Sequence, residues 1–200
     1  MLIVISDPAP VSNEATFINQ LFDEGLAVFH LRKPESTEQE MMALLQKINA
    51  AHYPKIALHA HHSIADRFGI NRLHIHEAAR KQMEGAGMND ARNTVFSTSI
   101  HNSADYADLP DLFDYTFLGP VFDSISKMGY KALTGDQRIL IPQKKQVQLI
   151  ALGGINAANC SLPLEWGFDG VAVLGALWKD PAQLIKNFKA IHAVCTTIAR

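Results

Sequence analysis

Cysteine is scarce in this 200-residue chain, and long apolar runs and an excess of either charge are missing from it. The two cysteines, Cys160 and Cys195, are too few for the disulfide framework of a small secreted domain. No apolar run approaches the roughly 18–20 residues that a membrane helix needs. Eighteen basic and 20 acidic residues leave a net charge of −2, without the basic excess of nucleic-acid-binding proteins. The chain is therefore expected to bind neither nucleic acid nor a membrane.

The first ten residues, MLIVISDPAP, lack the basic segment and the apolar length of a signal peptide, so we expect a cytoplasmic protein. A hydrophobic content of 48% with 19% charged residues is typical of a folded globular chain. The length fits one domain over residues 1–200. The sequence leaves open whether that domain forms a homo-oligomer.

Short apolar or β-branched runs alternate with helical patterns along the whole chain. Eight of them predict strands, namely Leu2–Ile5, Ala27–Leu31, Lys55–His59, Arg72–Ile75, Thr94–Thr98, Tyr115–Leu118, Gln148–Ala151 and Gly170–Leu174. Continuous apolar runs of this kind are typical of parallel strands that helices cover. Eight strand–helix units predict an α/β fold, a single-domain (β/α)₈ TIM barrel. An open doubly wound sheet is the rival, but no G-x-G-x-x-G fingerprint follows the first strand.

Several helices have recognisable beginnings. Asn13 is placed to cap the first helix, and Ser36–Gln39 fits a capping box before the second. Asp180-Pro181 puts a capping residue before a proline at the start of the last helix. In a chain of this length the third and fourth helices must be short. We expect Gly119–Gly135, with few periodic apolar positions, to be a long loop.

The active sites of such barrels are built at the carboxyl ends of the strands. The polar side chains at or just past the predicted strand ends are Asp7, His30, Arg32, His59, His61, His62, His74, His76, Ser99, His101, Ser124, Ser126 and Lys127. Their gathering at one rim predicts that the catalytic or binding site lies there. The hydroxyls and the ammonium of the last three suit phosphate or pyrophosphate oxygens, although a solvated loop would look the same.

Two glycine-containing turns are placed to bind a phosphate. Gly153 and Gly154 follow the seventh strand, and Leu174 and Gly175 follow the eighth. Glycine lets the backbone approach an oxyanion closely, and free amides at a helix start attract it. Such a pair after strands seven and eight is typical of phosphate binding in barrels. A plain strand-to-helix turn is the alternative.

Histidine is abundant, with nine residues, five of them between positions 59 and 76. His59 and His61, like His74 and His76, are two residues apart and would share one face of an extended segment. Such imidazoles are candidate ligands for zinc or another divalent ion, although no C-x₂-C or H-E-x-x-H motif accompanies them. Structural histidines are the alternative. His101, after the fifth strand, is a candidate proton carrier because histidine titrates near neutrality.

Several segments, in order, resemble the thiamine phosphate synthase/TenI superfamily, whose fold is a (β/α)₈ barrel. The segments that carry this resemblance are Phe29–Lys33, Ser99–His101, Asp114-Tyr115, Gly119–Phe122 with Lys127, Gly153–Asn156 and Gly167–Val173. The resemblance spans nearly the whole chain and implies a thiazole phosphate ligand. The synthase joins that ligand to hydroxymethylpyrimidine pyrophosphate with Mg²⁺ and releases pyrophosphate. The TenI-like thiazole tautomerase moves a proton on a thiazole carboxylate phosphate and needs no metal.

The same resemblance implies roles for individual residues. Those implied in catalysis are His101, His30, Arg32 and Lys127. Those implied in holding substrate or phosphate are Ser99, Ser124, Ser126, Gly153, Gly154, Leu174 and Gly175. In the synthase pattern two aspartates hold magnesium, but this chain has Ala60 and Asn71 at the corresponding positions.

We therefore expect a tautomerase, with His101 and His30 as general acid and base and Arg32 binding the substrate carboxylate. No cofactor is expected for that reaction, whereas the synthase alternative would need Mg²⁺. Two further alternatives are a phosphate-ligand binder without activity and a metal-dependent barrel enzyme that uses the histidine cluster.

Overall fold

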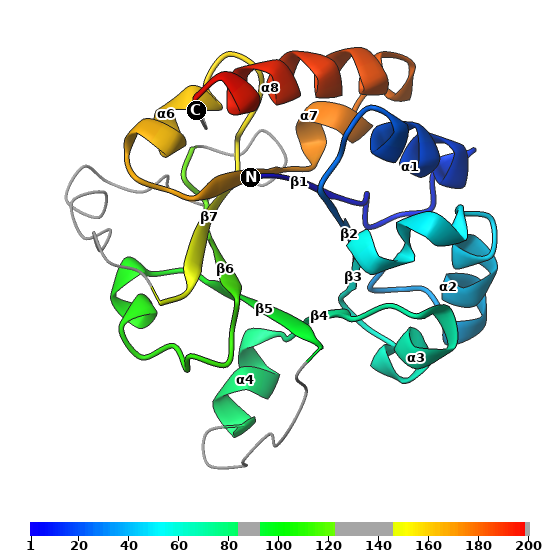
Figure 1. The fold of residues 1–200 in the computed structure, drawn as a ribbon, viewed down its shortest axis with the longest axis horizontal. Helices are drawn as coiled ribbons and strands as arrows, with labels where there is room; N and C mark the ends of the chain where they lie inside the picture. The colour runs from blue at the N-terminus through cyan, green and yellow to red at the C-terminus, as the bar shows by residue number, and fades with distance from the viewer. Residues whose placement is uncertain (84–92, 123–145, 199–200) are drawn as a thin grey trace.

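Eight parallel strands close into a barrel in the computed structural model, which describes residues 1–83, 93–122 and 146–198 (Figure 1). Each strand pairs with the next along the chain, and β1 pairs with β8 to close the ring. The strands are β1 (Leu2–Ile5), β2 (Val28–Leu31), β3 (Ile56–Leu58), β4 (Arg72–His74), β5 (Val95–Ile100), β6 (Tyr115–Leu118), β7 (Gln148–Leu152) and β8 (Gly170–Val173). The predicted (β/α)₈ barrel is confirmed, and each predicted strand end lies within two residues of the observed one.

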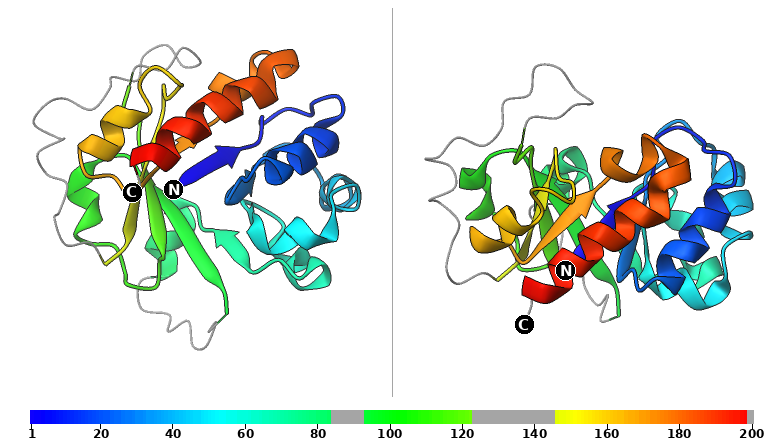
Figure 2. Two further views of the ribbon diagram at one scale, coloured as in Figure 1. Left: turned by 45° about the horizontal axis from the view of Figure 1, so that its top comes forward. Right: turned by 90° about the horizontal axis from the view of Figure 1, so that it is seen from above.

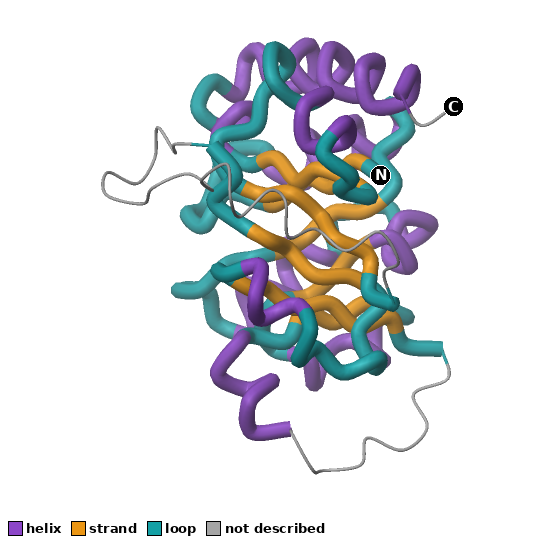
Figure 3. The backbone as a smooth tube through the Cα atoms, turned by 90° about the vertical axis from the view of Figure 1, so that its left-hand side faces the viewer, coloured by secondary structure: helices purple, strands orange, loops and turns teal. Residues whose placement is uncertain are grey.

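Helices lie outside the ring of strands, and in the side view they lie above and below it (Figures 2 and 3). They are α1 (Glu14–Asp23), α2 (Glu38–Leu45), α3 (Ala65–Phe68), α4 (Glu77–Met83), α6 (Ser161–Glu165), α7 (Gly175–Trp178) and α8 (Leu184–Ile198). Four 3₁₀ turns are also described, η1 (Ala50–Lys55), η2 (His62–Ile64), η3 (Ser103–Tyr106) and η4 (Pro181–Gln183). As expected, α3 is short, with four residues, whereas α4 is described only up to Met83, where the described segment ends. Most of the predicted loop Gly119–Gly135 lies outside the described residues.

The helix starts differ from the sequence expectation in two places. The capping box begins one residue later than predicted, because the Thr37 side chain accepts from the Glu40 N–H while Glu40 accepts from Thr37 N–H. Asn13 precedes α1 in a left-handed conformation, and its side chain forms no capping hydrogen bond. Asp180 caps as predicted, accepting from the Ala182 N–H at the start of η4, which leads directly into α8.

Alternate residues of each strand face opposite sides of the barrel wall. Leu2 and Val4 of β1 belong to the large core between the strands and the helices. Ile3 and Ile5 of the same strand belong to a smaller apolar cluster, together with β7 and β8 residues such as Ile150 and Ala172. By contrast, β2, β4, β5 and β6 each place at least one buried polar side chain in the barrel wall. No helix in the described parts of the chain has both the length and the apolar content needed to cross a membrane.

Candidate functional site

The turn after β7 lies directly against the end of β6. The Val121 N–H donates to the Leu152 carbonyl at 2.9 Å, and the Phe122 N–H donates to the Gly153 carbonyl at 3.2 Å. Gly153 has a φ of +101°, and a Cβ at this position would lie 2.7 Å from Pro120 Cα. Glycine is therefore required here both for its conformation and for the close approach of the two segments. The contact holds the backbone after β6 and the backbone after β7 together at the carboxyl end of the barrel.

The expectation that this turn opens directly into a helix is wrong. The next helix, α6, begins only at Ser161, seven residues beyond Gly154, and no side chain caps it. The intervening segment forms its own turn, in which the Asn156 side chain accepts from the Ala158 N–H and Asn159 Oδ1 accepts from the Asn156 N–H. The helix dipole of α6 therefore does not stand behind the Gly153 and Gly154 amides. Phosphate binding at this turn would rest on the backbone N–H groups themselves.

The second predicted phosphate turn lies beside the first. Gly175 begins the four-residue α7, and Leu174 precedes it in a non-helical conformation. The strands that lead into the two turns are paired, with Leu152 of β7 opposite Ala172 of β8. The structure thus brings the Gly153–Gly154 and Leu174–Gly175 turns to adjacent positions at one end of the barrel. That arrangement suits a phosphate group between them.

Three histidines from consecutive strands meet in the barrel. His30 lies within β2, His59 directly follows β3, and His74 ends β4, and all three are buried, at 0%, 5% and 2% exposure. One ring nitrogen from each lies within 4.8 Å of the others. The rings of His59 and His74 are stacked, with centroids 4.0 Å apart. We call these three residues the histidine trio.

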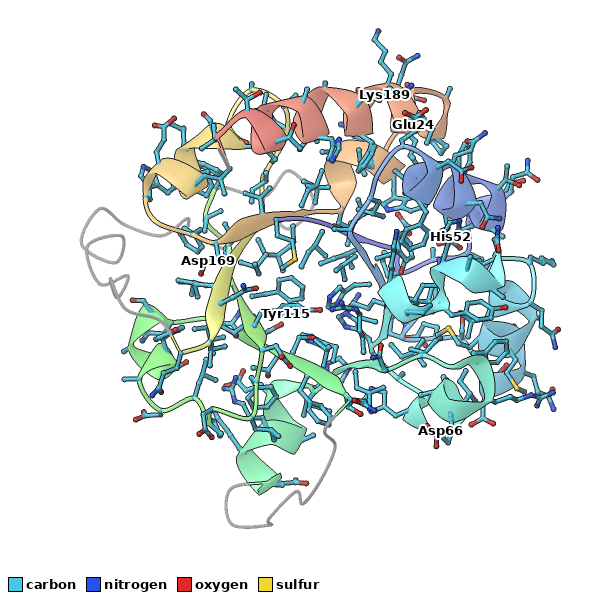
Figure 4. All side chains as sticks on the ribbon, viewed as in Figure 1. Glu24, His52, Asp66, Tyr115, Asp169 and Lys189 are labelled. Carbon is cyan, nitrogen blue, oxygen red and sulfur yellow. The ribbon has the colours of Figure 1, made fainter. Side chains whose placement is uncertain are left out.

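Hydroxyl groups hold two rings of the trio in place. His30 Nδ1 lies 2.8 Å from His59 Nε2, and His30 Nε2 lies 2.7 Å from the Tyr115 hydroxyl. His74 Nδ1 lies 3.0 Å from Ser97 Oγ, and its Nε2 lies 3.2 Å from Ser99 Oγ. Figure 4 shows the Tyr115 side chain within the ring of strands. The arrangement is a continuous hydrogen-bonded chain from β6 through β2 to β3.

Burial keeps the trio uncharged at neutral pH. Desolvation is the largest cause that lowers the pKa of His30, to about 3, and the nearby Arg72 charge adds to it. Desolvation likewise holds the pKa of His59 and of His74 well below the ordinary value, followed by repulsion from neighbouring histidines. Burial also raises the pKa of the Tyr115 hydroxyl to about 12. The interior of this half of the barrel therefore offers neutral hydrogen-bonding groups.

The other three histidines near this end of the barrel, His61, His62 and His76, do not belong to the trio. His61 Nε2 lies 2.8 Å from the Ser36 carbonyl, so its ring is engaged with the segment before α2. His62 Nε2 lies 3.1 Å from the Leu58 carbonyl. His76 is exposed, with its ring centroid 5.9 Å from that of His59. Of the four histidines that the sequence suggested for a metal, the structure groups two, and it adds His30 to them.

His101 and Arg32 lie at the same end of the barrel. His101 is exposed, and its Nδ1 is 3.3 Å from the Gly119 carbonyl. The half-buried Arg32 follows β2, and its charge contributes to lowering the pKa of both His59 and His74, after desolvation. Ser99 is half-buried beside the trio. The remaining predicted site residues Ser124, Ser126 and Lys127 lie outside the described residues.

Lys33 and Glu14 form a buried ion pair that sequence reasoning did not single out. The Lys33 ammonium lies 2.7 Å from Glu14 Oε1 and donates to the Asp7 and Ala9 carbonyls, each at 2.7 Å. The pKa of Glu14 is raised because desolvation outweighs the attraction of Lys33. This lysine therefore ties the loop after β1 to the end of β2. No local sequence signal distinguishes such a pair from two solvated charges.

Ala60 and Asn71 do not form a magnesium site. Ala60 has no side-chain ligand, and Asn71 stands before β4, at the amino end of the barrel, where it is exposed and donates to the Asn93 carbonyl. The expectation that these two positions correspond to a pair of metal ligands is therefore wrong on position as well as on residue type. Mg²⁺ prefers oxygen ligands, whereas the metal-ligand group found among the described residues consists of three imidazoles.

Sequence reasoning also missed Tyr115 and Ser97, which contact the trio from within strands β6 and β5. The prediction took residues at or just past the strand ends, whereas these two side chains come from within the strands. Their period of two with Phe117 and Ser99 was a usable signal, because residues two apart share one face of a strand.

Comparison with known proteins gives a consistent result. The family model described as thiamine monophosphate synthase matches residues 2–177. The thiamine-phosphate synthase of Koribacter versatilis is 27% identical over 180 residues, which cover 88% of this chain and 84% of that protein. A crystal structure of thiamine phosphate pyrophosphorylase from Bacteroides thetaiotaomicron superposes with a TM-score of 0.78 and 26% identity, over 98% and 97% of the two chains. The Pyrococcus furiosus thiamine phosphate pyrophosphorylase, at 18% identity and a TM-score of 0.77, shares the fold over 100% of this chain and 96% of its own.

These comparisons overturn the expectation of a tautomerase. The relatives that match along most of the chain are named synthases, and so is the matching family model. The residue at position 71 does not argue against a synthase, because Asn71 lies before β4, at the amino end of the barrel.

Proposed function

Because the chain belongs to the thiamine monophosphate synthase family, we propose that it joins hydroxymethylpyrimidine pyrophosphate to a thiazole phosphate and releases pyrophosphate. The observation that carries this proposal is the family match over residues 2–177, which includes all eight strands of the barrel. The two adjacent phosphate turns after β7 and β8 support it, since both substrates carry phosphate groups.

The reaction makes modest chemical demands on side chains. The thiazole nitrogen forms a bond to the methylene carbon of the pyrimidine, and the bond from that carbon to the pyrophosphate oxygen breaks. Pyrophosphate leaves with the electron pair, and no proton passes between the two substrates. The protein must bind two anionic groups, align two rings and stabilise the charge that develops on the leaving oxygen.

The described residues suggest how the two substrates are arranged. We assign the thiazole phosphate to the backbone of the Gly153–Gly154 and Leu174–Gly175 turns. Arg32 is placed to bind the pyrophosphate, for which a planar guanidinium is well suited. The histidine trio is uncharged and buried, so neither anionic group is assigned to it.

The resemblance adds Ser124, Ser126 and Lys127 as pyrophosphate contacts and Ser99 as a residue that holds substrate or phosphate, and we retain them as part of the proposal. His101 contacts the Gly119 carbonyl at the barrel end, and we assign it to substrate binding because the joining reaction transfers no proton.

Magnesium belongs to the proposed assay as part of the pyrophosphate substrate. Mg²⁺ keeps several of its waters and is commonly bound through substrate phosphates. Since Ala60 and Asn71 cannot hold the ion as a pair, no role in the mechanism is assigned to a resident ion.

The test is direct synthesis with purified protein, thiazole phosphate and the magnesium complex of hydroxymethylpyrimidine pyrophosphate. Thiamine phosphate and pyrophosphate are expected to appear together in equal amounts. Arg32→Gln should raise the KM for the pyrophosphate substrate by about 10–100-fold, since hydrogen bonds to a charged group are lost. Glu35→Gln, an exposed change nearby in sequence, is the matched control and should leave KM unchanged. Calorimetric binding of the substrates without any product would overturn the proposed reaction.

A further inference from the structure

We propose that the histidine trio is a binding site for one divalent ion of the zinc class, held by a ring nitrogen each from His30, His59 and His74. Strands β2, β3 and β4 are consecutive neighbours in the barrel, so strand pairing and not a loop sets the spacing of the three rings. One nitrogen from each ring already lies within 4.8 Å of the others. The site is distinct from the magnesium pair that the family resemblance implied.

The donor set determines the class of ion. Imidazole nitrogen suits Zn²⁺, Co²⁺, Ni²⁺ and Cu²⁺, whereas Mg²⁺ prefers oxygen. Three protein ligands around zinc leave a fourth tetrahedral position for water or a ligand oxygen. With Zn–N bonds of about 2.0–2.1 Å, two tetrahedral nitrogens are about 3.3 Å apart. His30 Nδ1 and His59 Nε2, now 2.8 Å apart, would need to separate slightly, whereas nitrogens as far apart as 4.8 Å would need to close by about 1.5 Å.

Neighbouring groups support the rings as they would in a metal site. The ring nitrogen of a metal ligand that faces away from the ion is usually held by a hydrogen bond that orients the ring. The Tyr115 hydroxyl lies 2.7 Å from His30 Nε2, and Ser97 Oγ lies 3.0 Å from His74 Nδ1. His59 is different, because its buried Nδ1 has no hydrogen-bond partner among the described residues. With Nε2 toward the ion, the His59 ring therefore lacks the orienting hydrogen bond that the His30 and His74 rings have.

Two arginine charges oppose the binding of a dication: that of Arg72, which contributes to lowering the pKa of His30 after desolvation, and that of Arg32. Arg32 is close enough to His59 and His74 for its charge to contribute to their lowered pKa values, after desolvation and the neighbouring histidines. Arg32 is half-buried, so solvent screens its charge in part. Removing the Arg32 charge should therefore tighten metal binding, whereas removing a ligand should weaken it, so the two kinds of variant test the proposal in opposite directions.

The experiment measures metal binding on the full chain, purified without a histidine tag and freed of metal with a chelator. Zn²⁺ is titrated against a chromophoric chelator, and Co²⁺ is titrated while its visible absorption is followed. We expect one equivalent of either ion and the strong absorption of tetrahedral Co²⁺. Because no substrate or turnover is involved, failure of this test leaves the proposed synthase reaction standing, and failure of the synthase assay leaves this proposal standing.

Five variants locate the ion. His59→Gln and His74→Gln should each weaken Zn²⁺ binding at least about 100-fold, while His52→Gln, outside the barrel in η1, should not change it. Arg32→Gln should tighten binding several-fold. Tyr115→Phe keeps all three ligands and should weaken binding about 10-fold, so it decides the matter if the histidine variants fail to fold. The proposal is overturned if the folded wild-type protein binds no equivalent of Zn²⁺ or Co²⁺, or if His59→Gln and Tyr115→Phe both bind as the wild type does.

Discussion

Replacing Gly153 by alanine should damage both the fold and the binding of thiazole phosphate. The residue has a φ of +101°, and an added Cβ would lie 2.7 Å from both Cα and Cβ of Pro120. The left-handed backbone costs a residue with a side chain about 1–2 kcal/mol. Forcing an extra methyl group into a packed contact costs about 1–3 kcal/mol more. We expect Gly153→Ala to lose about 2–5 kcal/mol of unfolding free energy.

Gly69 provides the matched control. It also has a positive φ, of +63°, but a Cβ built there has no neighbour within 4 Å. Gly69→Ala therefore carries only the conformational cost, about 1–2 kcal/mol, which a less flexible unfolded chain offsets in part. The difference between the two variants isolates the contact between the turn after β7 and the end of β6.

Thermal unfolding and urea titration measure this difference. For a chain of this size, 1 kcal/mol corresponds to about 2–4 °C in Tm, so Gly153→Ala should melt roughly 4–20 °C below the wild type. In the synthase assay its KM for thiazole phosphate should rise at least about 10-fold, because the backbone amides are displaced. If Gly153→Ala and Gly69→Ala are equally stable and Gly153→Ala keeps the wild-type KM, the turn does not bind phosphate as reasoned.

Three further predictions follow from the buried charges and the proposed reaction. Lys33→Met should lower the free energy of unfolding, measured with urea, by about 3–5 kcal/mol because Glu14 loses its buried partner. Adding Glu14→Gln should recover part of that loss, and a double variant whose loss equals the sum of the two single losses would refute the coupling. In metal-free protein, the free energy of unfolding should fall as the pH drops below about 6.5. The reason is that His30 binds a proton in the unfolded chain at this pH, whereas in the folded chain its pKa is about 3 and it stays neutral. His30→Gln should reduce that slope by up to about 1.4 kcal/mol per pH unit, and an unchanged slope would contradict the assignment. His101→Ala should lower kcat of the synthase reaction less than about 10-fold, whereas a loss of about 10²–10⁴ would indicate proton transfer by this residue.

The barrel was predictable because its signals are local. Each strand is a short apolar run, and the helix starts carry capping residues within a few positions of the observed ones. The tight turn after β7 was also predictable from Gly153 and Gly154, since few other residues adopt a left-handed backbone conformation. Its support by a helix dipole was not predictable, because Asn156 and Asn159 form a separate turn and α6 begins only after it.

The sequence by itself determined the eight units, their order and which residues of each strand share a face, because these depend on spacing along the chain. Only the tertiary structure decided that His30, His59 and His74 meet, that Tyr115 supports them and that Asn71 lies at the opposite end. The physical reason is closure of the barrel. Strand register and the joining of β1 to β8 determine which face points inward and which inward residues of different strands lie at one level, and no single segment carries that information.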